Sequence, residues 1–195
     1  MLNPAWTRMR RRFTIVHRRS FSTVHREMKK TISTKVTSAN IAQILGLLAE
    51  TPGMLEVLGR SVPVKKWKHP LGEGERSLTE TLAHLVNSEA RTSESIYLAL
   101  LMDEPLIVTI HSERDWGRLL QYDLSDFDEL LLYFKFRRKV MLRVLSDLSE
   151  AQWFRAICEE GKQRKETVYW RARSLALHEV EHVGELKEKI SAAAL

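Results

Sequence analysis

Cysteine, glycine, proline and long apolar runs are all scarce in this sequence. The single cysteine, Cys158, rules out an internal disulfide and fits a reducing, cytoplasmic compartment, which is the location we expect. No apolar run approaches the roughly 18 residues that mark a membrane span, so we expect no membrane partner. Eight glycines and five prolines among 195 residues leave few turns, which is typical of long helices. A chain of this length suits one domain with one core.

The positive charge is confined to the first part of the chain. Residues 1–35 contain seven arginines, three lysines and one acidic residue, Glu27, so their net charge is +9. The whole chain carries +6, and the remaining 160 residues therefore carry −3. This part of the chain has no basic stripe for nucleic acid, so we expect the folded domain to bind none.

Residues 1–37 are accordingly interpreted as a basic N-terminal extension without a fold of its own. Such a segment could bind anionic partners or act as an arginine-rich targeting peptide. It has neither a clear helical periodicity nor the apolar core of a signal peptide. We therefore favour an unstructured extension, or a chain whose natural start is Met28. The folded domain is expected to span residues 38–195.

Four segments have the apolar periodicity of amphipathic helices, and none of any length alternates as a strand does. The string "SLTE" is a capping box, in which Ser77 and Glu80 satisfy amides of the first helical turn. Pro52 should break the first helix, because proline fits only a helix's first turn. The helices are expected over residues 38–60, 77–102, 125–148 and 167–192. This pattern predicts an all-α fold, a four-helix bundle whose long loops allow a crossover connection.

Of the seven histidines, three lie on predicted helices, and two of these belong to the string "HEVEH". His178 and His182 are one turn apart, so both imidazoles leave one helix face and can bind one ion. Spacing alone is equally compatible with two partly exposed histidines. A zinc protease would need Glu179 beside the bound water and a third ligand farther along the chain. Only glutamates on the same helix follow, so we exclude the protease, and His84 is the one other helical histidine.

Short segments spread over most of the chain occur in a recognisable order. They are "LLAETPGMLEVL", "SLTETLAHLVNSE", "DW", "LYFKFRRKVMLRVLSDLSEAQW" and "GKQRKETVYWRARSLALHEVEHVGEL". In this order they resemble the DinB/YfiT-like family of four-helix bundles over residues 38–192. The resemblance implies that His84, His178 and His182 bind a divalent metal ion. Zinc or nickel is the expected ion, with iron or manganese as further candidates, because three imidazoles do not select one metal.

The resemblance also implies an activity. An ion held by three histidines keeps open positions and lowers the pKa of a water or thiol that binds to it. We expect a metal-dependent enzyme acting on a small-molecule substrate, either a thiol S-transferase that uses a low-molecular-weight thiol or a hydrolase. The alternative is a non-catalytic metal-binding or stress-response bundle. No catalytic residue is assigned, and a homodimer is a further expectation.

Two positions depart from the pattern of the resembled family. Glu185 stands where many relatives have glutamine, three residues after the last histidine. Arg76 stands just before the capping serine, where relatives often have tryptophan. A change at the pocket's rim bears on substrate choice, so the family's substrates do not carry over to this chain directly.

Charged residues also fall on apolar helix faces. Arg138 continues the apolar seam of the third helix, and Glu89 lies in the apolar arc of the second. Buried charges are costly unless they are paired. We therefore expect Glu89 and Arg138 to pair, with Glu179 as a rival partner. The alternative is that the helices are rotated and both side chains reach water. Cys158 has acidic neighbours that disfavour a thiolate, so it is not expected to be catalytic.

Overall fold

Four long helices dominate the computed structural model of the protein, which describes residues 32–108 and 113–193. They are α2 (Ser38–Ser61), α3 (Leu78–Leu101), α5 (Phe127–Ser146) and α7 (Val168–Ala193). Each begins and ends within two residues of its predicted bounds. The predicted four-helix bundle is confirmed.

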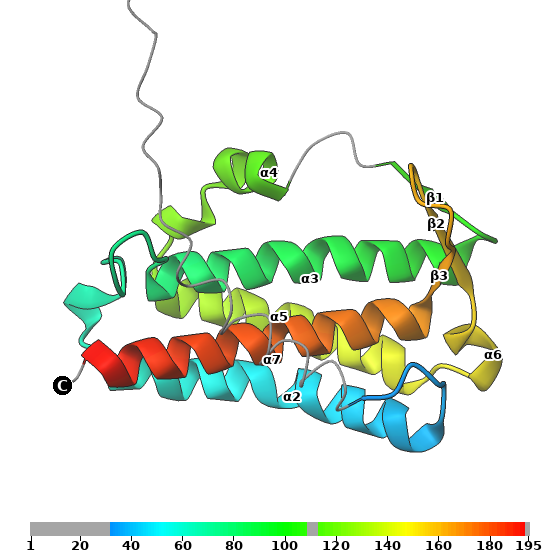
Figure 1. Ribbon diagram of the computed structural model, residues 1–195, viewed down its shortest axis with the longest axis horizontal. Coiled ribbons are helices and arrows are strands. Elements are labelled where there is room, and N and C mark those ends of the chain that lie inside the picture. The colour runs from blue at the N-terminus through cyan, green and yellow to red at the C-terminus, as the bar shows by residue number, and fades with distance from the viewer. Residues whose placement is uncertain (1–31, 109–112, 194–195) are drawn as a thin grey trace, which may run out of the picture. The chain divides into compact units, whose positions relative to one another are not determined.

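The order in which the helices pack explains the long connections. α2 packs against α5 and α7, and α3 packs against the same two helices. Figure 1 shows α2 and α7 running in one direction and α3 and α5 in the other. The chain that leaves α3 must therefore return along the bundle before α5 can begin. This crossover contains β1 (Leu106–Ile107), α4 (Glu113–Leu120) and η2 (Tyr122–Leu124).

A small sheet lies at one end of the bundle and was not predicted. β2 (Ala156–Glu159) pairs in parallel with β1 and antiparallel with β3 (Glu166–Thr167). Cys158, expected in a loop, lies in β2 opposite Leu106. Strands of two to four residues are too short for an alternating pattern to be recognised. Two shorter elements, η1 (Val64–Lys66) and α6 (Glu150–Trp153), complete the described structure.

The start of α3 has the predicted capping box. The backbone N–H of Glu80 donates to Ser77 Oγ over 3.1 Å, and the backbone N–H of Ser77 donates to Glu80 Oε2 over 2.6 Å. Two amides that the helix leaves without partners are thereby satisfied. This cap fixes where α3 begins, and with it the side of the helix on which His84 lies.

The prediction that Pro52 breaks the first helix is wrong. α2 continues through Pro52, which is buried inside it. A proline has no N–H, so the carbonyl four residues earlier, that of Leu48, loses its helical partner. The guanidinium of Arg138 on α5 donates to this carbonyl oxygen instead. A tertiary hydrogen bond therefore replaces the one that proline removes.

The core includes a residue six positions before the predicted domain boundary. Ile32 is fully buried in the core cluster that includes Tyr169 and Ala172 of α7. Its carbonyl oxygen accepts hydrogen bonds from Nε and Nη2 of Arg173, over 2.9 and 2.7 Å. The Tyr169 hydroxyl donates to the carbonyl of Ser33. The rest of the predicted extension, residues 1–31, lies outside the described residues.

This docking predicts how truncation affects stability. A chain that begins at Met28 should unfold like the full chain, because it keeps Ile32. A chain that begins at Ser38 should lose about 2–4 kcal/mol, since it lacks a buried isoleucine and two hydrogen bonds to Arg173. Urea unfolding followed by circular dichroism measures both. Equal stability of the two shortened chains would contradict the role of Ile32.

α2 is both long and apolar. Among the described helices, α2 is the one whose length and composition would allow it to cross a bilayer. Core helices of bundles meet the same criterion, and α2 packs against α5 and α7 here.

Candidate metal centre

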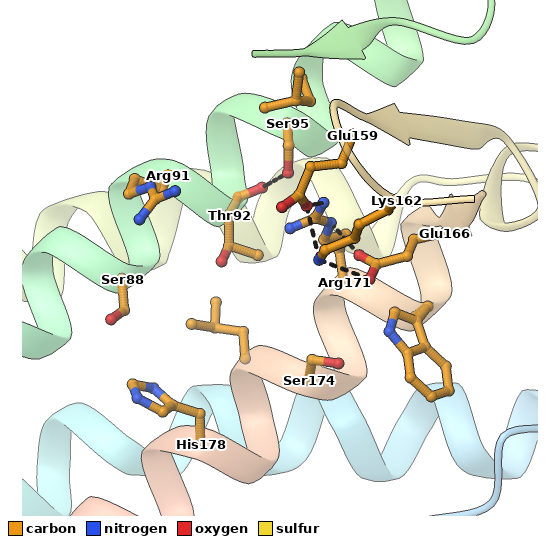
Figure 2. A pocket seen from close by; sticks show the side chains of 13 residues that line it. Ser88, Arg91, Thr92, Ser95, Glu159, Lys162, Glu166, Arg171, Ser174 and His178 are labelled. Carbon is orange, nitrogen blue, oxygen red and sulfur yellow. Dashed lines mark hydrogen bonds and ion pairs between the residues drawn. The ribbon is translucent and has the colours of Figure 1, made fainter. Parts of the chain in front are cut away.

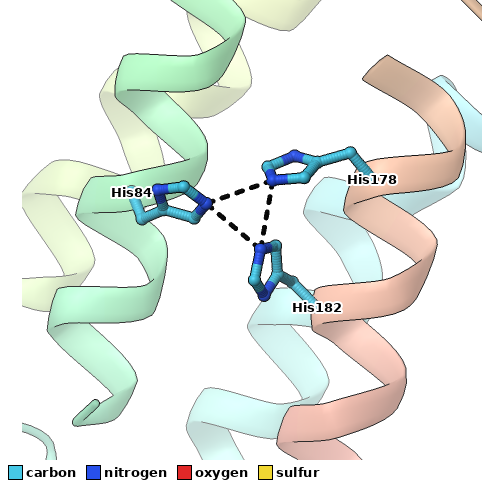
Figure 3. Close-up of side chains that lie close together, drawn as sticks. All are labelled: His84, His178 and His182. Atoms are coloured by element: carbon cyan, nitrogen blue, oxygen red, sulfur yellow. Dashed lines mark hydrogen bonds between the residues drawn. The ribbon is translucent and has the colours of Figure 1, made fainter. Parts of the chain in front are cut away.

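Three histidine side chains meet between α3 and α7. Figure 3 shows His84 of α3 pointing at His178 and His182 of α7. Each of the three Nε2···Nε2 distances is 3.1 Å. The rings stand nearly edge to face, at 68° to 86° to one another. The structure thus brings together all three residues that were predicted as metal ligands.

The local sequence explains this convergence. His178 and His182 are four residues apart on α7, so their side chains leave the helix one above the other. His84 lies seven residues after the capping serine of α3, the helix that packs against α7. All three side chains are half-buried. The site therefore opens at the flank of the bundle and is not sealed in its core.

Glu185 favours one tautomer of His182. Its Oε2 lies 3.2 Å from Nδ1 of His182, three residues earlier on α7. An ionised carboxylate only accepts hydrogen bonds, so Nδ1 of His182 carries the proton. Nε2 of His182 then directs a lone pair toward the other two rings. Carboxylate support of this kind is the usual second partner of a metal-binding histidine.

The donor set fits a divalent transition metal. Metal–nitrogen bonds of about 2.0–2.1 Å separate the nitrogens of one ion by roughly 3.0–3.4 Å, and the 3.1 Å triangle lies within that range. When Nδ1 of every ring carries the proton, the three Nε2 lone pairs meet at one point, an arrangement that a bound cation stabilises. Imidazole donors suit zinc, nickel, copper and iron, so the donor set does not choose among these ions.

A layer of buried charge links the two helices that carry the histidines. Arg138 of α5 donates to Glu89 of α3 over 2.9 Å and to both carboxylate oxygens of Glu179 of α7. All three side chains are at most 2% exposed. The predicted pair of Glu89 with Arg138 is confirmed, and Glu179 joins it as a second partner. One guanidinium thereby holds α3 and α7 together close to the histidines.

Two cations and two carboxyl groups meet in this layer. Arg137 adds a second cation, with its Nε 3.6 Å from Glu89 Oε1. Burial raises the pKa of Glu179 to about 7, although the nearby Arg138 lowers it. Burial likewise raises the pKa of Glu89 against the effect of Arg138. The two carboxyls therefore hold their protons more firmly than exposed glutamates do.

The position of Glu179 bears on the protease alternative. A metalloprotease needs this glutamate beside the bound water. Here the Glu179 carboxylate is fully buried, and both of its oxygens accept hydrogen bonds from Arg138. The structure therefore supports the exclusion that was made from the sequence.

Two pockets adjoin the histidine triangle. One, of about 380 Å³, includes His178 and lies between α3, α7 and the hairpin of β2 and β3. Figure 2 shows it with Arg91 and Ser88 on α3 and Ser174 on α7. The other, of about 790 Å³, includes His84 and extends toward Arg76, Gly117 and Asp123. The centre is thus accessible to small molecules from both sides.

Two residues near this centre were not predicted from the sequence. Glu185 was noted only as a departure from the resembled family, although its spacing of three from His182 places both on one helix face. Arg91 was not singled out. Its spacing of seven from His84 is two helical turns, which also places both on one face. Helical spacing from the predicted ligands would have found both residues.

Comparison with known proteins agrees with this description. The DinB superfamily profile matches residues 47–186. YfiT from Bacillus subtilis, described as a probable metal-dependent hydrolase with an unusual four-helix bundle topology, has a similar structure with a TM-score of 0.72. It is 16% identical, and the match covers 80% of this chain and 89% of YfiT.

A protein from Streptococcus pneumoniae has a similar structure as well, with a TM-score of 0.60 and 15% identity, over 86% of this chain and 96% of that one. At these identities the structural similarity concerns the fold. None of the curated proteins matches the sequence significantly. The family profile covers well over half of the chain, and on that evidence the protein belongs to the DinB superfamily.

Proposed function

We propose that this protein is a divalent-metal-dependent enzyme that acts on a small molecule. The observation that carries the proposal is the 3.1 Å triangle of three Nε2 atoms. His84, His178 and His182 would hold the ion, and Glu185 would keep the His182 ring in its ligating tautomer. Membership of the DinB superfamily and the fold shared with YfiT, a probable metal-dependent hydrolase, support this assignment.

The chemistry that such an ion supplies is the activation of a nucleophile. A divalent ion lowers the pKa of a water or thiol that binds to it, which makes a strong nucleophile available near neutral pH. The chain's own residues position the ion, shape the adjoining pockets and leave the centre half-buried. The two reactions that follow are hydrolysis and transfer of a low-molecular-weight thiol to an electrophile. We propose zinc or nickel as the ion and a cytoplasmic location, with a homodimer as the assembly to test.

Metal analysis of protein purified without chelators is the first test. We expect close to one equivalent of metal per chain, and an apo protein whose melting temperature rises when zinc or nickel is added. The loaded protein is then assayed for ester hydrolysis, and for consumption of bacillithiol, mycothiol or glutathione with an added electrophile. A protein that takes up no metal, and whose melting temperature ignores zinc, nickel and manganese, would favour a non-catalytic bundle.

A further inference from the structure

We propose that the pocket between α3, α7 and the β2–β3 hairpin binds the substrate of this centre through a carboxylate held by Arg91. The inference rests on the proposed function in taking the histidine triangle as the reactive end of the site. His178 belongs to both the triangle and the pocket, so a molecule in the pocket can reach the centre. Arg91 lies on the pocket's α3 wall, as Figure 2 shows.

The charges around the pocket leave one cation uncompensated. Lys162 lies 2.9 Å from Glu159 and 3.4 Å from Glu166. Arg171 pairs with the same two glutamates. Burial opposes ionisation of Glu159, but hydrogen bonds from Lys162 and Arg171 outweigh it and lower its pKa. These four residues are therefore neutral as a group.

Arg91 is the remaining charge of the pocket. Its side chain is exposed, and none of the ion pairs among the described residues includes it. A planar guanidinium binds a carboxylate through two parallel hydrogen bonds. One uncompensated positive charge matches a singly charged anion better than a phosphate monoester, which carries about −1.5 to −2 at neutral pH. The pocket therefore suits a monocarboxylate.

Helical spacing sets a minimum length for the substrate. Arg91 follows His84 by two turns on the same face of α3, which is about 10 Å along the helix axis. On α7 the same direction passes from His178 to Ser174, which also lines the pocket. A substrate that reaches both Arg91 and the centre is thus an elongated molecule with its carboxylate far from the reacting atom.

The pocket that includes His84 is the alternative site for a substrate carboxylate. It contains two cations, Arg76 and Arg118, and two carboxylates, Glu80 and Asp123. Its charges balance, so it offers an anion no net attraction. Arg118 nevertheless supplies a matched control, because replacing it removes one positive charge from the pocket that includes His84.

The experiment compares the zinc-loaded wild type with Arg91→Gln and Arg118→Gln by isothermal titration calorimetry. The probes are hexanoate, hexyl phosphate, 6-mercaptohexanoate and 6-mercaptohexanol. We expect Arg91→Gln to weaken hexanoate and 6-mercaptohexanoate about 10-fold or more, the usual effect of losing a hydrogen-bonded charge. Binding of 6-mercaptohexanol should not change, and Arg118→Gln should behave like the wild type. Metal content and melting temperature should be equal in all three proteins.

The other outcomes of this titration distinguish the carboxylate site from its alternatives. Hexanoate that does not bind the wild type, or binds Arg91→Gln equally well, overturns the carboxylate site. A loss of binding in Arg118→Gln assigns the anion to the pocket that includes His84 and overturns the carboxylate site too. Tighter binding of hexyl phosphate than of hexanoate overturns the choice of a carboxylate. If hexanoate and 6-mercaptohexanoate bind equally well through Arg91 while 6-mercaptohexanol does not bind, the inference stands and the thiol-transfer form of the proposed function fails.

Discussion

Replacing Arg138 with methionine should lower the free energy of unfolding by about 3–5 kcal/mol, the usual cost of removing one partner from a buried ion pair. The change leaves Glu89 and Glu179 buried without their main cation. It also removes the donor to the Leu48 carbonyl, which Pro52 has deprived of its helical partner. Small domains are stable by only about 5–15 kcal/mol, so this single change is expected to bring the bundle close to unfolding.

Urea unfolding of the variant measures the loss, and Arg143→Met is the matched control. Arg143 lies on the same helix but is exposed, so its replacement should change stability by less than about 0.5 kcal/mol. Adding Glu89→Gln and Glu179→Gln to Arg138→Met should restore part of the loss, because the buried negative charges are then gone. An Arg138→Met protein as stable as Arg143→Met would show that the buried charges contribute little to the free energy of unfolding.

His84→Ala should weaken zinc binding by about 100-fold or more, as should His178→Ala and His182→Ala. Removing a residue that only supports a metal ligand already costs about 10–100-fold, and loss of a ligand should cost at least as much. The three effects should be similar, because the three Nε2 atoms form an equal-sided triangle. Competition with a chromophoric chelator measures the affinities, and metal content after gel filtration provides the stoichiometry.

Two further variants separate this result from a general loss of structure. His69→Ala removes an exposed loop histidine and should leave zinc binding unchanged. Glu179→Gln should keep its metal and change stability, because Glu179 binds Arg138 and not the histidine triangle. A protease would give the reverse pattern, in which Glu179 is needed for turnover and His84 is not. Full metal occupancy in His84→Ala would refute the three-histidine site.

Features that repeat with the helical period could be predicted from the sequence. The apolar pattern and the capping box located α3, and the spacing of four placed His178 and His182 on one face of α7. Arg138 and Glu89 were identified as a pair because each interrupts an apolar face. In all these cases the signal lies within one helix, where the geometry of neighbouring residues is known in advance. Metal binding by the three histidines stays a prediction.

What could not be predicted depends on contacts between distant segments. Pro52 is tolerated inside α2 because Arg138, 86 residues later in the sequence, supplies a donor to the Leu48 carbonyl. Ile32 belongs to the fold because Arg173 and Tyr169 of α7 bind its segment. β1 pairs with β2 across some 50 residues of chain. Such contacts leave no periodic pattern in the sequence. The basic composition around Ile32 instead favoured placing this residue outside the folded domain.

The hydrogen bond between Arg138 and the Leu48 carbonyl has a consequence for the register of the bundle. Apolar helix faces tolerate sliding by a turn, because one leucine can replace another. If α2 slid along α5 by one turn, the guanidinium would face carbonyls already bonded within the helix, and the Leu48 oxygen would be left buried without a donor. Only one alignment of the two helices satisfies both groups. Pro52, a residue that usually ends a helix, thus helps to fix the register of α2 against α5.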